Sequence, residues 1–211
     1  MTTVFDSLEL AHQSGWAAID VEGDGNDPQT PVEIAVVQGD GPGPSAVLTW
    51  TVNPGRPLGP FVSTLHGLTD EDLATAPTFD EIATRLSGAI SGRTLVAHAA
   101  KEDLAMLARV MPDVATLPTA ILDTQRIARN LLQRAGRYSL EALVTHLDIE
   151  MHGQGRGGFH TAAFDAMATA RLFGRLSELA PKEGRLARHY VRCGVFSPRP
   201  QMAEPASTHR P

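Results

Sequence analysis

Cysteine is almost missing from this 211-residue sequence, which contains only Cys193. A single thiol cannot form an internal disulfide, and this agrees with a reducing compartment. Long apolar runs are missing too, since no stretch approaches the roughly 18–20 residues that span a bilayer. The first residues also lack the basic patch and apolar run of a secretory signal. We therefore expect a soluble cytoplasmic protein that does not bind membranes.

Positive charge is also scarce. The 18 Lys and Arg residues face 24 Asp and Glu residues, which gives a formal net charge of −6. This balance argues against a protein that binds nucleic acid over a broad basic surface. It does not exclude an enzyme that takes one strand end into a metal site, because cations held by clustered carboxylates can receive the phosphate.

The distribution of apolar residues predicts an α/β fold. Short runs rich in aliphatic and β-branched residues predict strands at 15–21, 32–38, 46–52, 94–97 and 117–122. Helical spacing predicts helices at 70–75, 79–90, 100–110, 124–133, 139–147 and 161–179, with a glycine-rich loop at 153–158 before the last of them. Strands followed by alternating strands and helices favour a mixed sheet over a helix bundle. We expect one domain over 1–180, followed at 181–211 by a short helix and a flexible Pro-rich tail.

A pair of acids stands at the end of the first predicted strand, in the segment AIDVEG. Alternate residues of a strand share a face, so Asp20 and Glu22 project together. Two carboxylates so close repel each other unless a proton or a cation neutralises them. The alternative is that the strand has already ended and that both acids are solvated turn residues.

Two further acids and a histidine stand at the starts of helices. Asp103 falls in the first turn of the helix at 100–110, where it could simply complement the helix dipole. Asp165 falls on a small and apolar stripe of the last helix, where an isolated charge needs a partner. His160 lies just before that helix, either over the same site or as a surface or capping residue.

Together these segments resemble the DEDDh 3′→5′ exonucleases, the family that includes the proofreading epsilon subunit of bacterial DNA polymerase III, RNase T and oligoribonuclease. The family has an acid-x-acid at the end of the first strand, an Asp in a His-Asn-Ala-x-Phe-Asp segment, and a His-x4-Asp ending. The matching residues of this chain are Asp20, Glu22, Asp103, His160 and Asp165. The segments VNPGRP, TLHGLTDED, ILDTQRIAR and YSLEALVTHLDI extend the resemblance over about residues 16–176.

The resemblance implies an RNase H-like fold, a five-stranded mixed sheet with helices on both faces. It also implies a two-metal-ion hydrolysis of phosphodiester bonds from the 3′ end of nucleic acid. Oxygen ligands without thiolates favour two Mg²⁺ or Mn²⁺ ions. Asp20 would bridge the ions, Glu22 and Asp165 would complete the site that activates water, and Asp103 would hold the second ion. His160 would be the general base, because imidazole titrates near neutral pH.

Substrate contacts are expected at Gly23, Leu65 and His66, which match segments that approach the terminal nucleotide in the family. Three positions depart from the family pattern: Gly23 replaces the usual Thr, and Ala99 and Glu102 replace the usual Asn and Phe around Asp103. The carboxylates and the histidine are intact, so we expect the chemistry to survive.

The expected substrates are single-stranded 3′ ends, with DNA favoured over RNA. The alternatives are RNA end trimming, as in RNase T and oligoribonuclease, and a catalytically silent binding module. A polymerase or another repair protein is left open as a partner.

Overall fold

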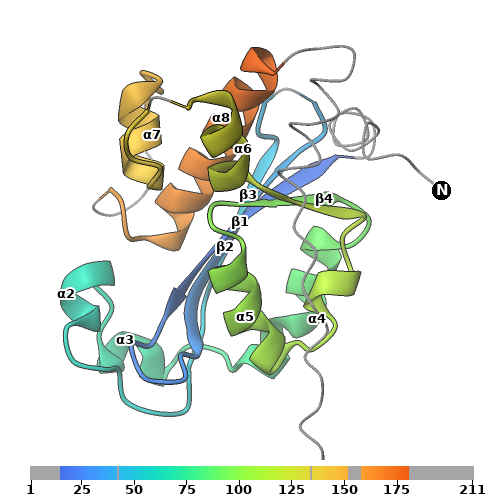
Figure 1. Ribbon diagram of the computed structural model, residues 1–211. Coiled ribbons are helices and arrows are strands. Elements are labelled where there is room, and N and C mark those ends of the chain that lie inside the picture. Colours follow the sequence, from blue (N-terminus) through green and yellow to red (C-terminus); the bar gives the residue numbers. More distant parts are fainter. Residues whose placement is uncertain (1–14, 42, 134, 152–157, 181–211) are drawn as a thin grey trace, which may run out of the picture.

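The structure is a computed structural model that describes residues 15–41, 43–133, 135–151 and 158–180 (Figure 1). Five strands form its sheet: β1 (Trp16–Gly23), β2 (Pro31–Gly39), β3 (Ala46–Thr51), β4 (Thr94–Ala97) and β5 (Ala120–Asp123). Their order is β3-β2-β1-β4-β5. Strand β2 is antiparallel to both β1 and β3, whereas β4 is parallel to β1 and β5 is parallel to β4. This confirms the predicted five-stranded mixed sheet.

Helices cover both faces of the sheet (Figure 1). They are α2 (Val62–His66), α3 (Asp70–Ala74), α4 (Phe79–Ile90), α5 (Lys101–Val110), the 3₁₀ turn η1 (Val114–Thr116), α6 (Thr124–Leu131), α7 (Leu140–His146) and α8 (Ala162–Leu179). Among the described helices none is long and apolar enough to cross a bilayer.

Strand alternation builds a separate apolar core on each face. Ala18 of β1 and its neighbours on the same face pack under α6, α7 and α8. Ala17, Ile19 and Val21 point the other way, against α4 and α5. Because Asp20 is two residues after Ala18, it belongs to the face that α8 covers.

The edge-to-face contact between Trp16 and Phe173, with ring centroids 6.0 Å apart, fixes α8 along β1. From there α8 runs back toward the far end of the strand. Four residues of strand rise about 13 Å, and eight residues of helix rise about 12 Å. Asp165, eight residues before Phe173, therefore reaches the level of Asp20, four residues after Trp16.

The sequence missed α2 and η1 and placed the start of the fifth strand three residues early, at 117 instead of Ala120. The unexpected helix α2 directly follows the Pro- and Gly-rich segment 53–60. The glycine-rich loop, apart from Gly158, and the predicted helix and tail at 181–211 lie outside the described residues.

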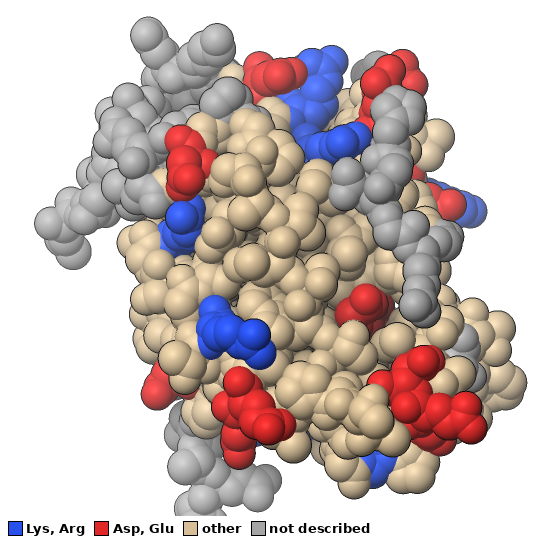
Figure 2. All heavy atoms as spheres, turned by 180° about the vertical axis from the view of Figure 1, so that it is seen from behind, with Lys and Arg blue, Asp and Glu red and all other residues tan. Residues whose placement is uncertain are grey.

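Charged side chains on the face shown in Figure 2 are scattered, with wide uncharged areas between them. Lys and Arg do not gather into a broad patch on this face. This agrees with the formal net charge of −6. On this face, therefore, no extended basic surface is present to hold a nucleic-acid substrate.

The link between β4 and α5 contains a backbone conformation that its residue disfavours. Ala99 has φ of +59°, a left-handed conformation, and its N–H donates to Asp123 Oδ1 at 3.3 Å. This is the position at which the family pattern has Asn, a residue that tolerates this conformation far better than Ala.

We predict that Ala99→Asn stabilises the protein by about 1 kcal/mol, or roughly 2–4 °C in melting temperature for a domain of this size. Ala99→Val should lower the melting temperature, because a β-branched residue suits positive φ least. Thermal unfolding of both variants beside the wild type checks this. An Asn variant that melts below the Val variant would contradict the explanation.

Candidate active site

Three carboxylates converge at the end of β1. Among the described residues, Asp20, Glu22 and Asp165 each offer an oxygen atom, and the three atoms lie within 4.8 Å of one another. Asp20 and Glu22 come from the same face of β1, as the sequence predicted, and Asp165 comes from the first turns of α8. Oxygen atoms at such separations can bind one cation, whose bonds to carboxylates are about 2.0–2.6 Å long.

Asp165 fits a metal ligand in a second respect. Its side chain is buried, and Oδ2 accepts a hydrogen bond from the backbone N–H of His160 at 3.1 Å. Its other oxygen, Oδ1, is buried without a hydrogen-bond partner among the described residues. An unpaired buried carboxylate oxygen is costly, and a cation beside Asp20 would satisfy it.

Asp103 approaches the same strand from α5. It is buried, and its Oδ1 accepts a hydrogen bond from the backbone N–H of Val21 at 3.1 Å. It does not belong to the group of three within 4.8 Å. Its charge nevertheless acts on Asp20 more strongly than that of any other acid around it. The structure therefore places Asp103 next to the cluster, with one oxygen already used by the backbone.

Burial and mutual repulsion make this cluster unfavourable in its charged form. Desolvation, followed by the charges of Asp103, Glu22, Asp165 and Glu33, raises the pKa of Asp20 well above its ordinary value. Desolvation also raises the pKa of Asp103 to about 8 and that of Asp165 to about 6. Such shifts are expected where carboxylates are held together for a divalent cation.

The metal-free protein should lose stability as the pH rises from 5 toward 8.5. An acid whose pKa is raised in the folded state makes its full contribution to stability at pH values below its pKa in the unfolded chain, which is near 4. That contribution is lost as the pH rises past the pKa of each acid in the folded state, which is about 6 for Asp165 and about 8 for Asp103. Saturating Mg²⁺ or Mn²⁺ should remove this loss, because the bound cations neutralise the carboxylates.

Melting temperatures in EDTA and in Mg²⁺, measured across this pH range, provide the test. Asp103→Asn is the matched variant, since its amide oxygen can still accept from Val21 N–H. In EDTA, the melting temperature of this variant should fall less with rising pH than that of the wild type. A melting temperature of the metal-free wild type that rises over the same range would show that the cluster is not strained by charge.

His160 lies at the entrance to the cluster. It is exposed, has φ of +71°, and directly precedes Thr161, the N-cap of α8. Desolvation raises the pKa of Glu22, and the charge of His160 partly opposes this rise, so the imidazole is close to that carboxylate. The sequence-based interpretation of His160 as a residue leaning over the site stays a prediction.

His66 of α2 reaches the cluster from the opposite side. Its Nε2 is 3.2 Å from the carbonyl oxygen of Gly23, and its Nδ1 is 3.2 Å from Glu22 Oε2. Desolvation lowers the pKa of His66. The contact with Glu22 is therefore an ion pair only when His66 is protonated.

The loop before α2 is tied to the loop after β1, which explains why His66 lies there. Asp24 is fully buried and pairs with Arg56 at 2.5 Å. It also accepts from the N–H of Thr30 at 3.0 Å. Gly59 N–H donates to the carbonyl oxygen of Asp24 at 2.7 Å. These contacts hold the two loops together, with α2 beside Glu22.

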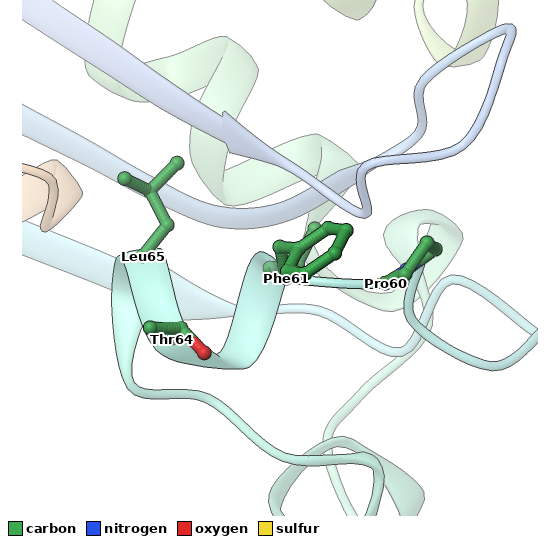
Figure 3. A pocket seen from close by; sticks show the side chains of 5 residues that line it. Pro60, Phe61, Thr64 and Leu65 are labelled. Atoms are coloured by element: carbon green, nitrogen blue, oxygen red, sulfur yellow. The ribbon is translucent and has the colours of Figure 1, made fainter.

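Leu65 and Phe61 form an apolar surface next to His66. Leu65 is 52% exposed and Phe61 83% exposed, and Figure 3 shows both side chains on the same side of α2. They line a hollow of about 350 Å³ with Pro60, Val62 and Thr64. Phe61 also has φ of +76°, which is unusual for a bulky residue. The sequence analysis singled out Leu65 but not Phe61.

Gly23 has a neighbour that explains its departure from the family pattern. A Cβ atom at this position would lie 1.9 Å from Gln29 Oε1 and 3.1 Å from Met106 Cε. The amide of Gln29 therefore occupies the space that the usual Thr side chain would need. A larger residue at 23 requires the Gln29 side chain to move.

Glu33 is a fifth acid at the site, and the sequence analysis did not identify it. It lies directly opposite Glu22 in the register of β1 and β2. Its Oε2 accepts a hydrogen bond from the N–H of Ala162, 129 residues away, at 3.0 Å. The one available signal was the pairing of β2 with β1, since residues opposite each other on antiparallel strands share a face.

The sequence profile of the exonuclease family of RNase T matches residues 17–173. This chain belongs to that family. The match confirms the predicted resemblance and the reaction class, metal-dependent hydrolysis of nucleic acid from its 3′ end. The profile covers all the site residues described above.

Two of its named relatives illustrate the similarity. The chain is 36% identical over 126 residues to a DNA polymerase III subunit epsilon-like protein of Rhodobacter capsulatus, covering 59% of this chain and 18% of that protein. It is 28% identical over 128 residues to a PolC-type DNA polymerase III of Caldanaerobacter subterraneus, covering 60% of this chain and 9% of that protein. The chain thus spans less than a fifth of the length of these relatives.

A solved structure of exonuclease X in complex with 5′ overhanging duplex DNA has the same fold. The TM-score is 0.67 at 24% identity, over 83% of this chain and 99% of that one. The similarity confirms the RNase H-like exonuclease fold.

Proposed function

We propose that this exonuclease domain releases nucleotides from single-stranded 3′ ends of DNA with the help of two Mg²⁺ or Mn²⁺ ions. The observation that carries the proposal is the convergence of Asp20, Glu22 and Asp165 within 4.8 Å beside His160. DNA is favoured because the similar proteins include a polymerase subunit-like protein and an exonuclease bound to DNA.

The residues divide into ligands and a base. Asp20 would bridge the two ions, Glu22 and Asp165 would complete the site nearer to His160, and Asp103 would hold the second ion directly or through water. When bound, the ions supply an activated water and neutralise charge on the leaving oxygen. His160 takes a proton from the attacking water, and its exposed position at the cluster leaves it accessible for this role.

The end of the strand is positioned by apolar and hydrogen-bonding groups. Leu65 and Phe61 offer their exposed side chains to the last bases, and apolar contact of this kind tolerates any base sequence. His66 and Gly23 lie between this apolar surface and Glu22, where the terminal sugar would come to lie. The names of the relatives suggest that such ends are made by a polymerase.

Digestion of labelled oligonucleotides tests the proposal. A 5′-labelled single strand should give a ladder of progressively shorter products in Mg²⁺ or Mn²⁺, and a 3′-labelled strand should release labelled mononucleotide at once. EDTA should abolish both. Duplex DNA and RNA of the same sequence serve as comparisons, because an RNA substrate would require recognition of the 2′-hydroxyl. Mononucleotide released first from a 5′ label, or turnover in EDTA, would overturn the proposal.

A further inference from the structure

Glu33 connects the start of α8 to the sheet. Its carboxylate accepts the N–H of Ala162, the first residue of that helix, at 3.0 Å. The N–H groups of a first helical turn have no partner within the helix and need one from outside. The N-cap residue, Thr161, does not supply it, since it makes no capping side-chain bond within the described structure. A strand residue therefore caps this helix.

The position of His160 depends on this anchor, the hydrogen bond from Ala162 N–H to Glu33, more than the positions of its neighbours do. This histidine precedes the helix, it is exposed, and its left-handed φ of +71° is a conformation that few residues other than glycine favour. Two bonds fix the backbone on either side of its ring: His160 N–H to Asp165 Oδ2 at 3.1 Å and Ala162 N–H to Glu33 Oε2 at 3.0 Å. Of these two bonds, the second ties this turn to β2, the strand next to the one that carries Asp20 and Glu22.

Asp165 is held in another way. It lies within an 18-residue helix whose buried side chains include Ala166, Leu172 and Phe173. The contact of Phe173 with Trp16 fixes that helix along β1. Loss of the bond to Glu33 would therefore release the turn at His160 while leaving Asp165 in place.

The position of Glu33 is unfavourable for a residue that only stabilises the fold. It is directly opposite Glu22, and like charges facing each other across strands are destabilising. Its charge also opposes ionisation of Asp20 and Glu22, after the larger effect of burial. A carboxylate at this place gains from the α8 amide, and from the cations that the cluster would bind.

We propose that Glu33 is a positioning residue that sets the place of His160 relative to the attacking water. It acts by fixing the first amide of α8 to β2 beside Glu22, and it contacts neither substrate nor leaving group. This inference rests on the proposed function, because Glu33 would act through His160, the proposed general base.

Three variants test the proposal in single-turnover hydrolysis at saturating Mg²⁺. Glu33→Ala should lower the rate constant about 10²-fold, the order expected when a catalytic group is displaced by about 1 Å. Glu33→Gln retains an oxygen that can accept from Ala162 N–H, so it should stay within about threefold of wild type. In a His160→Ala background, Glu33→Ala should cause less than a threefold further loss, because its effect passes through that histidine.

Glu81→Ala is the matched control. Glu81 also accepts the N–H of a helix start, that of Thr78 at 2.7 Å, but it caps α4. Both alanine variants should lower the melting temperature by a few degrees, whereas only Glu33→Ala should slow hydrolysis. Amide hydrogen exchange of the metal-free protein should accelerate at residues 160–165 in Glu33→Ala, and near Thr78 in the control.

Three outcomes would overturn the proposal. Equal losses from Glu33→Ala in the wild-type and His160→Ala backgrounds would mean that Glu33 does not act through His160. A loss from Glu33→Gln as large as that from Glu33→Ala would mean that the charge of Glu33, not its hydrogen bond, matters. Unchanged exchange at residues 160–165 would mean that it does not fix the turn. If the wild type releases no nucleotides, the proposed function itself fails, and the exchange measurement still tests the anchor.

Discussion

Asp20→Asn should reduce exonuclease turnover by at least about 10³-fold at saturating Mg²⁺, because several kcal/mol of transition-state stabilisation depend on cations that Asp20 would bridge. The substitution preserves shape and removes one charge from a crowded cluster. It should therefore raise the melting temperature of the metal-free protein, in which burial and the neighbouring acids oppose ionisation of Asp20. The two measurements together separate loss of the metal site from loss of the fold.

Asp40→Asn is a suitable control, since Asp40 is an exposed acid just after the far end of β2 and pairs with Arg93. Turnover of this variant should stay within about twofold of the wild type, because a surface ion pair contributes little energy. Turnover of Asp20→Asn within tenfold of the wild type would refute the assignment of Asp20 as the bridging ligand.

His160→Ala should lower the rate constant for hydrolysis by about 10²–10⁴-fold, the usual contribution of a general base. The concentration of Mg²⁺ needed for half-maximal rate should change little, because His160 is not proposed as a ligand. His146→Ala removes an exposed histidine at the end of α7 and should have no effect. Single-turnover hydrolysis of a 3′-labelled oligonucleotide measures all three proteins.

The pH dependence gives a second measure of the same role. At saturating Mg²⁺ the wild-type rate should rise with pH, because an imidazole general base must be neutral to accept a proton. In His160→Ala, the rise of the rate between pH 5.5 and 9 should become smaller or shift to other pH values. Superimposable profiles and equal rates would remove His160 from the mechanism and leave hydrolysis to the cations alone.

The parts of the site that follow local periodicity were predictable from the sequence. The alternation of β1 places Asp20 and Glu22 on one face, and helical spacing places Asp165 on the buried side of α8. The five strands were also predictable, because each is a short apolar run bounded by turn residues. Asp103 alone could equally have served the dipole of α5, and only its bond to Val21 places it at the cluster.

The parts that depend on long-range contacts were not predictable. Helix α2 is only five residues long and follows a Pro- and Gly-rich loop. Its place is set by the Asp24–Arg56 pair rather than by its own propensity. Glu33 lies in an otherwise apolar strand, and its partner is 129 residues away. Without the packed helix, nothing in its sequence neighbourhood distinguishes it from a solvated acid.

The return of α8 along β1 has a consequence for the order in which the molecule becomes active. Asp20 and Glu22 are among the first residues of the sheet to be synthesised, but His160 and Asp165 belong to the last described helix. A nascent chain that has completed all five strands therefore holds Asp20, Glu22, Glu33 and Asp103, but neither Asp165 nor His160. At the proposed site, nuclease activity would begin only when α8 has left the ribosome and docked on the sheet.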